Sequence, residues 1–141
     1  YSPTPSLIHD EKKKRVLIVD DNPFNLLTAS FIVSKLNLEP LTAANGQEAI
    51  DVLQESVISG QHYSFILMDI QMPIMDGIQA TKVINQRIQT GELYDVPVIA
   101  LTAKKIDAQE RTIYKDCGMF EALGKPLVEQ ELTNILKKLP N

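Results

Sequence analysis

The stretch SFILMDIQMPIMDG, residues 64–77, passes from a continuous apolar segment directly into an acidic residue and then into turn signals. Residues 65–68 are apolar without alternation, which is typical of a strand that is covered on both faces. Asp69 follows immediately, and Asp76-Gly77 later begins a new element. Because an unpaired buried carboxylate is energetically costly, an acid at the end of such a strand requires a compensating group elsewhere in the chain.

On both sides of this stretch, short apolar segments alternate with amphipathic ones, which predicts βα units around one parallel sheet and hence an α/β fold. The apolar segments predict five strands, at residues 16–20, 40–43, 65–68, 96–102 and 120–123. Apolar residues at helical spacing predict five helices, at about residues 23–37, 46–58, 78–88, 106–117 and 127–139. The continuous apolar character of residues 96–102 indicates a central strand.

The composition limits the function classes. The chain has 141 residues, of which 44% are hydrophobic and 23% charged, as in one soluble domain. Its net charge of -4 argues against direct binding of nucleic acid. A single cysteine, Cys117, excludes an internal disulfide and a cysteine-rich zinc site, and we interpret it as a small apolar helix residue. No apolar segment approaches the roughly 18 residues of a membrane span, so we expect no membrane contact by this chain.

The amino-terminal segment YSPTPSLIHDEKKK, residues 1–14, differs from the rest of the chain. It combines prolines, serines and charges without periodicity, which is typical of a linker or tail. We therefore expect the folded domain to span residues 15–141. Because the chain begins with Tyr1 rather than methionine, we also expect it to be a piece of a longer protein.

Polar residues stand at the carboxyl ends of the predicted strands, where open parallel sheets bind their ligands. They are Asp20-Asp21, Asp69 and Thr102, and Lys125 follows the last strand. Three carboxylates in one crevice repel one another unless a cation neutralises them. Carboxylate, carbonyl and water ligands suit Mg²⁺, so we expect a magnesium site here.

These residue types together indicate phosphoryl transfer. Asp69 is the candidate nucleophile, while Mg²⁺, Lys125 and the Thr102 hydroxyl would neutralise the oxygens of a phosphoryl group attached to it. The alternative is that the acids only begin loops and cap helices, a common role of aspartate. That alternative explains one acid at a strand end better than it explains four matching positions in register.

Four segments carry a resemblance to a known family: LIVDDNPFN (17–25), LMDIQMPIMDG (67–77), IALTAKK (99–105) and ALGKPL (122–127). In this order and spacing the chain resembles the receiver domains of two-component response regulators, most of all those attached to hybrid histidine kinases. The resemblance covers residues 15–141. It implies a flavodoxin-like (βα)5 fold, a doubly wound parallel sheet of strand order 2-1-3-4-5. It also implies phosphorelay signal transduction in the cytoplasm, or in the cytoplasmic part of a membrane-associated sensor.

The resemblance implies a role for each site residue. Asp69 would accept a phosphoryl group from a phosphohistidine of a kinase or histidine phosphotransfer protein. Asp21 would ligate Mg²⁺ directly, Asp20 mainly through water, and Gln71 through its backbone carbonyl. The modified domain would then switch conformation to control a partner or an attached kinase or output domain, without acting as an enzyme on other molecules.

The remaining implied roles concern switching. Thr102 would move toward the phosphoryl group, and Lys125 would pair with it and precede a cis peptide bond to Pro126. The family places a switch aromatic three residues before the lysine, where this chain has Ala122. We therefore expect signalling through shifts of the loop and helix in residues 103–118.

Two rival functions stay open at this point. A phosphohydrolase of Rossmann type would need a second acid two residues after its nucleophile, where this chain has Gln71. A degenerate receiver would act only as an interaction module, against which Asp69, Asp21 and Lys125 argue. Long side chains at Gln71 and Lys104 would obstruct the attacking water, so a phosphoryl half-life of minutes or longer is expected.

Overall fold

The computed structural model describes residues 13–140. Residues 1–12 of the predicted linker lie outside this range, so the linker stays a prediction. Within it, five strands and five helices alternate strictly, as predicted. The strands are β1 (Arg15–Val19), β2 (Glu39–Ala43), β3 (Tyr63–Asp69), β4 (Val98–Thr102) and β5 (Glu121–Gly124). The helices are α2 (Pro23–Lys35), α3 (Gly46–Ser59), α4 (Gly77–Thr90), α5 (Ala108–Cys117) and α6 (Glu129–Leu136).

The five strands form one sheet in the order β2-β1-β3-β4-β5, and every neighbouring pair is parallel. The predicted flavodoxin-like strand order is therefore confirmed. The order reverses at β1, so β1 and β3 lie side by side and their carboxyl ends flank a single crevice. The fold thereby brings Asp20, directly after β1, next to Asp69, the last residue of β3.

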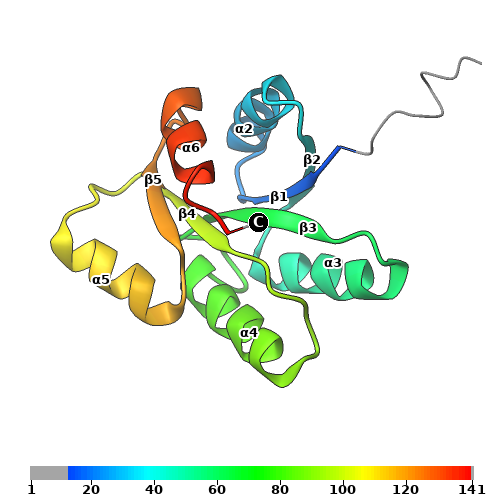
Figure 1. Cartoon of the computed structure of the whole chain (residues 1–141). Helices are drawn as coiled ribbons and strands as arrows, with labels where there is room; N and C mark the ends of the chain where they lie inside the picture. The colour runs from blue at the N-terminus through cyan, green and yellow to red at the C-terminus, as the bar shows by residue number, and fades with distance from the viewer. Residues whose placement is uncertain (1–12, 141) are drawn as a thin grey trace, which may run out of the picture.

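Helices cover both faces of the sheet (Figure 1). The helices α3, α4 and α5 pack on one face around a buried cluster that includes Leu17, Leu53, Ile66 and Ile84. The helices α2 and α6 pack on the other face around a second buried cluster that includes Val16, Val33, Leu67 and Leu132. Successive strand residues thus enter opposite cores, which explains why β3 is apolar without alternation.

All five strands differ from the predicted bounds by one or two residues, and β1 and β2 each begin one residue earlier than predicted. β4 begins at Val98 instead of residue 96, because Pro97 has no N–H to donate and contributes only its carbonyl, which accepts from the Ile66 amide at 2.9 Å. β3 continues through Asp69, so this acid belongs to the strand itself. β5 begins at Glu121, one residue later than predicted.

The last helix is shorter than predicted. It spans Glu129–Leu136, whereas apolar spacing predicted residues 127–139. The flanking residues Leu127 and Leu139 still pack against the core of α2 and α6, and apolar spacing cannot separate them from the helix they adjoin. In the described range, no helix combines the length and apolar character that a membrane span needs.

Candidate functional site

A pocket of about 200 Å³ opens at the carboxyl ends of the strands. The residues predicted from the sequence all line it, and they come from the ends of four strands: Asp20, Asp21, Asp69, Gln71, Thr102 and Lys125. Lys104, predicted to flank the site, lines it as well. The structure therefore brings together every residue that the sequence assigned to the site.

Asp69 is held rigidly at the base of this pocket. It is 6% exposed, and its Oδ1 accepts hydrogen bonds from the Ile70 amide at 2.9 Å and from the Lys125 ammonium at 2.9 Å. Burial raises the pKa of the Asp69 carboxyl above its ordinary value, and the hydrogen bond from Lys125 offsets this only in part. The side chain is thus fixed in orientation with one oxygen, Oδ2, free of these bonds, as a nucleophile requires.

Lys125 joins two buried carboxylates. Its Nζ lies 2.9 Å from Oδ1 of Asp69 and 2.7 Å from Oδ2 of Asp20. Burial lowers the pKa of the Lys125 ammonium, but the hydrogen bonds with the two carboxylates raise it by more, and the net pKa is above its ordinary value. Lys125 is therefore a permanent cation at neutral pH, and it compensates part of the negative charge of the site.

The remaining negative charge favours a bound cation. Carboxylate oxygens of Asp20, Asp21 and Asp69 all lie within 4.8 Å of one another, against one ammonium. Oδ2 of Asp20 is buried and, apart from the ion pair with Lys125, has no hydrogen-bond partner. An all-oxygen donor set of this charge, open to solvent on the Asp21 side, fits a hard divalent ion that keeps several waters.

The acids of the cluster do not cap helices. The helix N-caps at this end of the sheet are Asn22, Asn45, Asp76 and Asp107, and the side chain of each accepts hydrogen bonds from the first helical turn. Asp20 instead uses Oδ1 to accept from the Asn22 amide at 2.9 Å, which positions the residue that caps α2. The capping alternative is therefore wrong for Asp20, Asp21 and Asp69.

Thr102 ends β4 on the opposite side of the pocket and is 2% exposed. Its Oγ1 accepts from the Lys104 amide at 3.0 Å, and its carbonyl accepts from the Lys125 amide at 2.7 Å. The peptide bond from Lys125 to Pro126 is cis, as the resemblance implied. The backbone of Thr102 is thus bonded to the lysine segment while its hydroxyl reaches the pocket.

Gly77 packs against the end of β3 that carries Asp69, a contact that the sequence analysis missed. Its amide donates to the Ile70 carbonyl at 2.8 Å, so the start of α4 lies directly against the end of β3. A Cβ at this position would lie 2.0 Å from the backbone oxygen of Asp69. The Asp-Gly pair at the start of a helix was visible in the sequence, but the close approach to Asp69 depends on the packing of α4.

The comparisons with known proteins agree with this geometry. A family model, the response regulator receiver domain, matches residues 16–137. The chain belongs to this family of receiver domains. It is 34% identical over 124 residues to the sensor protein GacS of Pseudomonas syringae pv. syringae, covering 88% of the chain and 13% of that protein. It is 35% identical to the osmosensing histidine protein kinase SLN1 of Saccharomyces cerevisiae, covering 94% of the chain and 11% of SLN1.

Among solved structures, the receiver domain of the histidine kinase CKI1 from Arabidopsis thaliana, complexed with Mg²⁺, superposes with a TM-score of 0.79. The two chains are 29% identical, and the match covers 90% of this chain and 92% of that one. The receiver domain described here therefore shares its fold with receivers of hybrid histidine kinases. It spans only a small fraction, 13% and 11%, of the length of the curated sensor kinases that it matches.

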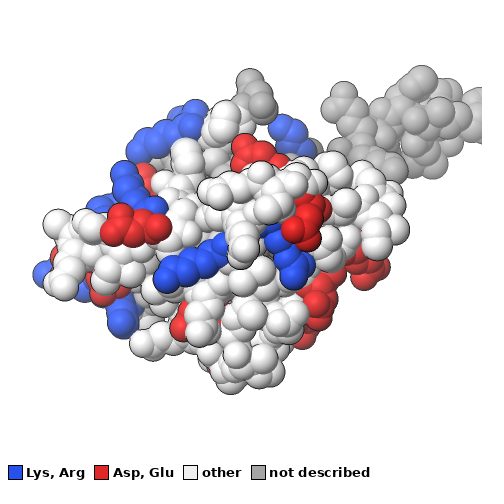
Figure 2. All heavy atoms as spheres, turned by 90° about the horizontal axis from the view of Figure 1, so that it is seen from below, with Lys and Arg blue, Asp and Glu red and all other residues white. Residues whose placement is uncertain are grey.

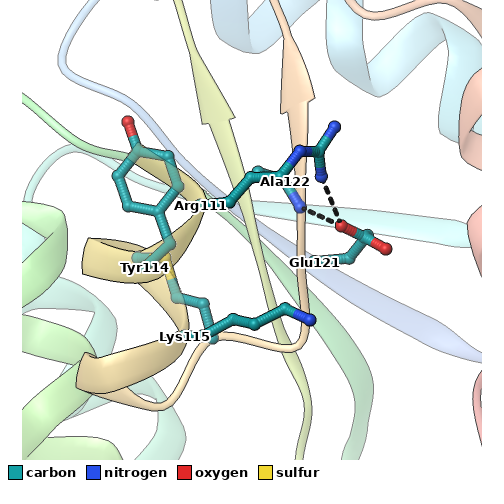
Figure 3. A pocket seen from close by; sticks show the side chains of 6 residues that line it. Arg111, Tyr114, Lys115, Glu121 and Ala122 are labelled. Atoms are coloured by element: carbon teal, nitrogen blue, oxygen red, sulfur yellow. Dashed lines mark hydrogen bonds and ion pairs between the residues drawn. The ribbon is translucent and has the colours of Figure 1, made fainter. Parts of the chain in front are cut away.

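This receiver domain departs from the family pattern at β5. Ala122, in the position of the switch aromatic, is 8% exposed and packs in the core shared with α5. Phe120 does not replace the aromatic, because it packs into the opposite core, between the sheet and α2 and α6. The space beside Ala122 is lined instead by Tyr114 of α5, which lies next to it in Figure 3.

Proposed function

We propose that this receiver domain accepts a phosphoryl group from a phosphohistidine donor onto Asp69 in a Mg²⁺-dependent reaction. The observation that carries the proposal is the position of Asp69, whose Oδ1 is bound by Lys125 while Asp20 and Asp21 lie within 4.8 Å. Asp69 Oδ2 attacks phosphorus, the bond from phosphorus to the donor histidine breaks, and the electron pair returns to the imidazole nitrogen. Lys125 neutralises part of the charge on the phosphoryl oxygens.

For the metal, Asp21 and Asp69 would supply direct carboxylate ligands, Gln71 its backbone carbonyl, and Asp20 a ligand through water. The all-oxygen set and its excess negative charge support this assignment. So does the similarity to the receiver of CKI1, which binds Mg²⁺ in its solved structure. When bound, Mg²⁺ neutralises the developing charge on the phosphoryl group. Thr102 then donates its hydroxyl to the same group.

The test is modification by a small phosphodonor. The chain is incubated with acetyl phosphate in the presence and absence of Mg²⁺, and the adduct is detected by intact mass. We expect an adduct that requires Mg²⁺ and disappears in Asp69→Asn but persists in Asp95→Asn, a matched control at an exposed aspartate outside the pocket. Failure of the intact chain to form an adduct would favour an interaction module, and turnover of unrelated phosphoesters would favour a phosphohydrolase.

The donor is a histidine kinase or a histidine phosphotransfer protein. It must cover the pocket to reach Asp69, and α2 borders that pocket through Asn25. Along the same helix Leu27 and Phe31 are 68% and 65% exposed and, with Phe24, form an apolar stripe. The blue and red side chains in Figure 2 are interspersed over the face drawn there, which gives no basic patch for nucleic acid on that face.

The stripe is tested by the double variant Leu27→Ala/Phe31→Ala. We expect transfer from a phosphorylated histidine phosphotransfer protein to slow about tenfold, which corresponds to about 1.4 kcal/mol of lost contact. Modification by acetyl phosphate should stay unchanged, because neither residue lines the pocket. Ile58→Ala, on an 87% exposed residue of α3, is the matched control. An equal loss with acetyl phosphate would show that the variant had damaged the site itself.

The parent protein is a hybrid histidine kinase or another multidomain sensor, in which residues 1–14 link this receiver to a preceding domain. The match to this chain covers only 13% of GacS and 11% of SLN1, which supports this proposal. The receiver is cytoplasmic, acts by switching conformation, and has no substrate other than its phosphodonor. Gln71 and Lys104 are exposed at the rim of the pocket and lengthen the phosphoryl lifetime to minutes. Complete loss of phosphate within seconds would contradict that lifetime.

A further inference from the structure

Tyr114 carries a buried hydroxyl that has no hydrogen-bond partner among the described residues. The side chain comes from α5 and is 2% exposed. An unsatisfied buried hydroxyl is costly, and native proteins rarely keep one without a functional reason. The mechanism proposed above does not use Tyr114, so this hydroxyl requires a separate explanation.

The surroundings of Tyr114 show what it could bond. Its ring lies beside Ala122 of β5, and both residues line one small pocket. In Figure 3 the hydroxyl points toward the end of the sheet where the arrowheads of the strands lie. Burial raises the pKa of the Tyr114 hydroxyl, the Glu110 carboxylate raises it further, and the Thr102 hydroxyl acts in the opposite direction. Thr102 lies at that same end of the sheet and on the same face. Strand β4 pairs with β5 so that Ala100 is opposite Ala122 and Thr102 is opposite Gly124, and residues two apart in a strand share a face.

Thr102 also lines the pocket of Asp69. Its Oγ1 accepts one hydrogen bond, from the Lys104 amide, at 3.0 Å. A threonine hydroxyl has one donor hydrogen and two acceptor lone pairs. Thr102 therefore has the capacity to donate toward a group on Asp69 and, at the same time, to accept from Tyr114.

We propose that Tyr114 is the switch aromatic of this receiver, contributed by α5 instead of β5. This inference rests on the proposed function of Asp69. When Asp69 carries a phosphoryl group, the Thr102 hydroxyl donates to a phosphoryl oxygen, and the Tyr114 hydroxyl donates to Oγ1 of Thr102 in place of the Lys104 amide. The Lys104 amide is released, and α5 follows the movement of its tyrosine.

The small side chain of Ala122 is a condition of this arrangement. A large aromatic at Ala122 would compete for the space beside Tyr114, because both positions line the same pocket. The coupling is expected to be modest. If the Tyr114 hydroxyl gains a hydrogen-bond partner only in the phosphorylated state, its removal weakens the affinity for a phosphoryl mimic about fivefold. This is the lower end of ordinary coupling between two sites.

The test uses ¹⁹F NMR. The chain has four tyrosines, and all are labelled as 3-fluorotyrosine. BeF₃⁻ and Mg²⁺ are added as the phosphoryl mimic, and the bound BeF₃⁻ is observed in the same spectrum. The Tyr114 resonance is identified by its loss in Tyr114→Phe. We expect this resonance to shift when BeF₃⁻ binds and to stay in place in Thr102→Ala, while the resonances of Tyr63 and Tyr94 do not move.

The affinity for BeF₃⁻ provides a second measurement. We expect it to weaken about fivefold in Tyr114→Phe and to be unchanged in Tyr63→Phe, a matched control on a buried tyrosine whose hydroxyl accepts from Arg15 at 3.0 Å. Bound BeF₃⁻ with an unmoved Tyr114 resonance, or an unchanged affinity in Tyr114→Phe, would overturn the inference and leave the proposed function standing. Absence of any bound BeF₃⁻ would overturn both.

Discussion

The ammonium nitrogen of Lys125 lies 2.9 Å from Oδ1 of Asp69, so the segment after β5 is tied to the last residue of β3 across the end of the sheet. In Lys125→Gln the carboxylates of Asp69 and Asp20 lose their cation. We expect the free energy of unfolding without Mg²⁺ to fall by about 2 kcal/mol, less than the ~3–5 kcal/mol of a fully buried pair because the pocket is open to solvent.

Urea unfolding monitored by circular dichroism measures this loss. Millimolar Mg²⁺ should narrow the difference between Lys125→Gln and the wild type, since a bound cation compensates the same carboxylates. A loss of equal size with and without Mg²⁺ would show that Lys125 acts through packing alone.

Magnesium itself should stabilise the fold. A ligand that binds only the native state at ten times its Kd raises the free energy of unfolding by about 1.4 kcal/mol. We expect Asp21→Asn to abolish this response, because the substitution removes a proposed metal ligand. Asp21 is the exposed acid of the cluster, so its replacement leaves the core intact. Thermal unfolding in Mg²⁺ and in EDTA gives the comparison. A full Mg²⁺ response in Asp21→Asn would place the metal elsewhere.

The close approach of Gly77 to β3 predicts a strong effect of a single methyl group. In Gly77→Ala the new Cβ would lie 2.0 Å from the backbone oxygen of Asp69, so α4 or β3 must move. We expect a loss of about 3 kcal/mol in stability and slower modification of Asp69 by acetyl phosphate. Gly124→Ala is the matched control, since a Cβ there meets nothing within 4 Å. Equal stability of the two variants would be inconsistent with the packing of α4.

Removal of the Tyr114 hydroxyl should stabilise the unmodified domain. The hydroxyl is buried and unpartnered, so Tyr114→Phe removes its desolvation penalty without leaving a cavity. We expect the free energy of unfolding to rise by about 1 kcal/mol. Chemical denaturation in the absence of phosphodonor is the measurement, and a destabilised Tyr114→Phe would mean that the hydroxyl already has a partner in the resting state.

The stability of the domain should fall in alkali partly through Cys117. Burial raises the pKa of this thiol above its ordinary value, so the unfolded chain loses the proton at lower pH than the native one. The stabilisation is therefore fully present below the unfolded pKa and is lost as pH rises through the raised native pKa. Cys117→Ala should lose less stability than the wild type above about pH 9.

Alkylation by iodoacetamide checks the same feature directly. At pH 8 the native thiol, which is 5% exposed and donates to the Tyr114 carbonyl at 3.1 Å, should react far more slowly than in the unfolded chain. A native rate equal to the unfolded rate would contradict its burial.

The sequence predicted the site well because a parallel sheet imposes its own geometry. Once Asp20, Asp69 and Thr102 were assigned to strand ends, the topology required them to meet, and the pocket confirms that they do. The pattern of apolar residues along the sequence likewise predicted every strand and helix. The bounds were wrong by a few residues where β4 begins after Pro97 and where core leucines flank α6.

What the sequence could not predict depends on how helices seat on the sheet. The role of Gly77 depends on the contact between α4 and Asp69, which the sequence does not show. The burial of Tyr114 depends on the direction of one side chain on α5, a helix of low hydrophobicity. Ala122 was recognised as a departure from the family pattern, but its meaning was invisible without the neighbour that fills the adjoining space. Strand ends follow from topology, whereas these contacts follow from packing.

The contact between Gly77 and Asp69 makes the surroundings of Asp69 unequal. Where α4 packs against the backbone of Asp69 there is no room even for a methyl group, so that side is stiff. On the other side, residues 103–105 and 107 are exposed and belong to no strand or helix. A small molecule that bridges α2 and this loop would therefore freeze the domain in one state, whereas a binder placed on α4 would leave its signalling intact. The asymmetry is a guide for inhibitor design.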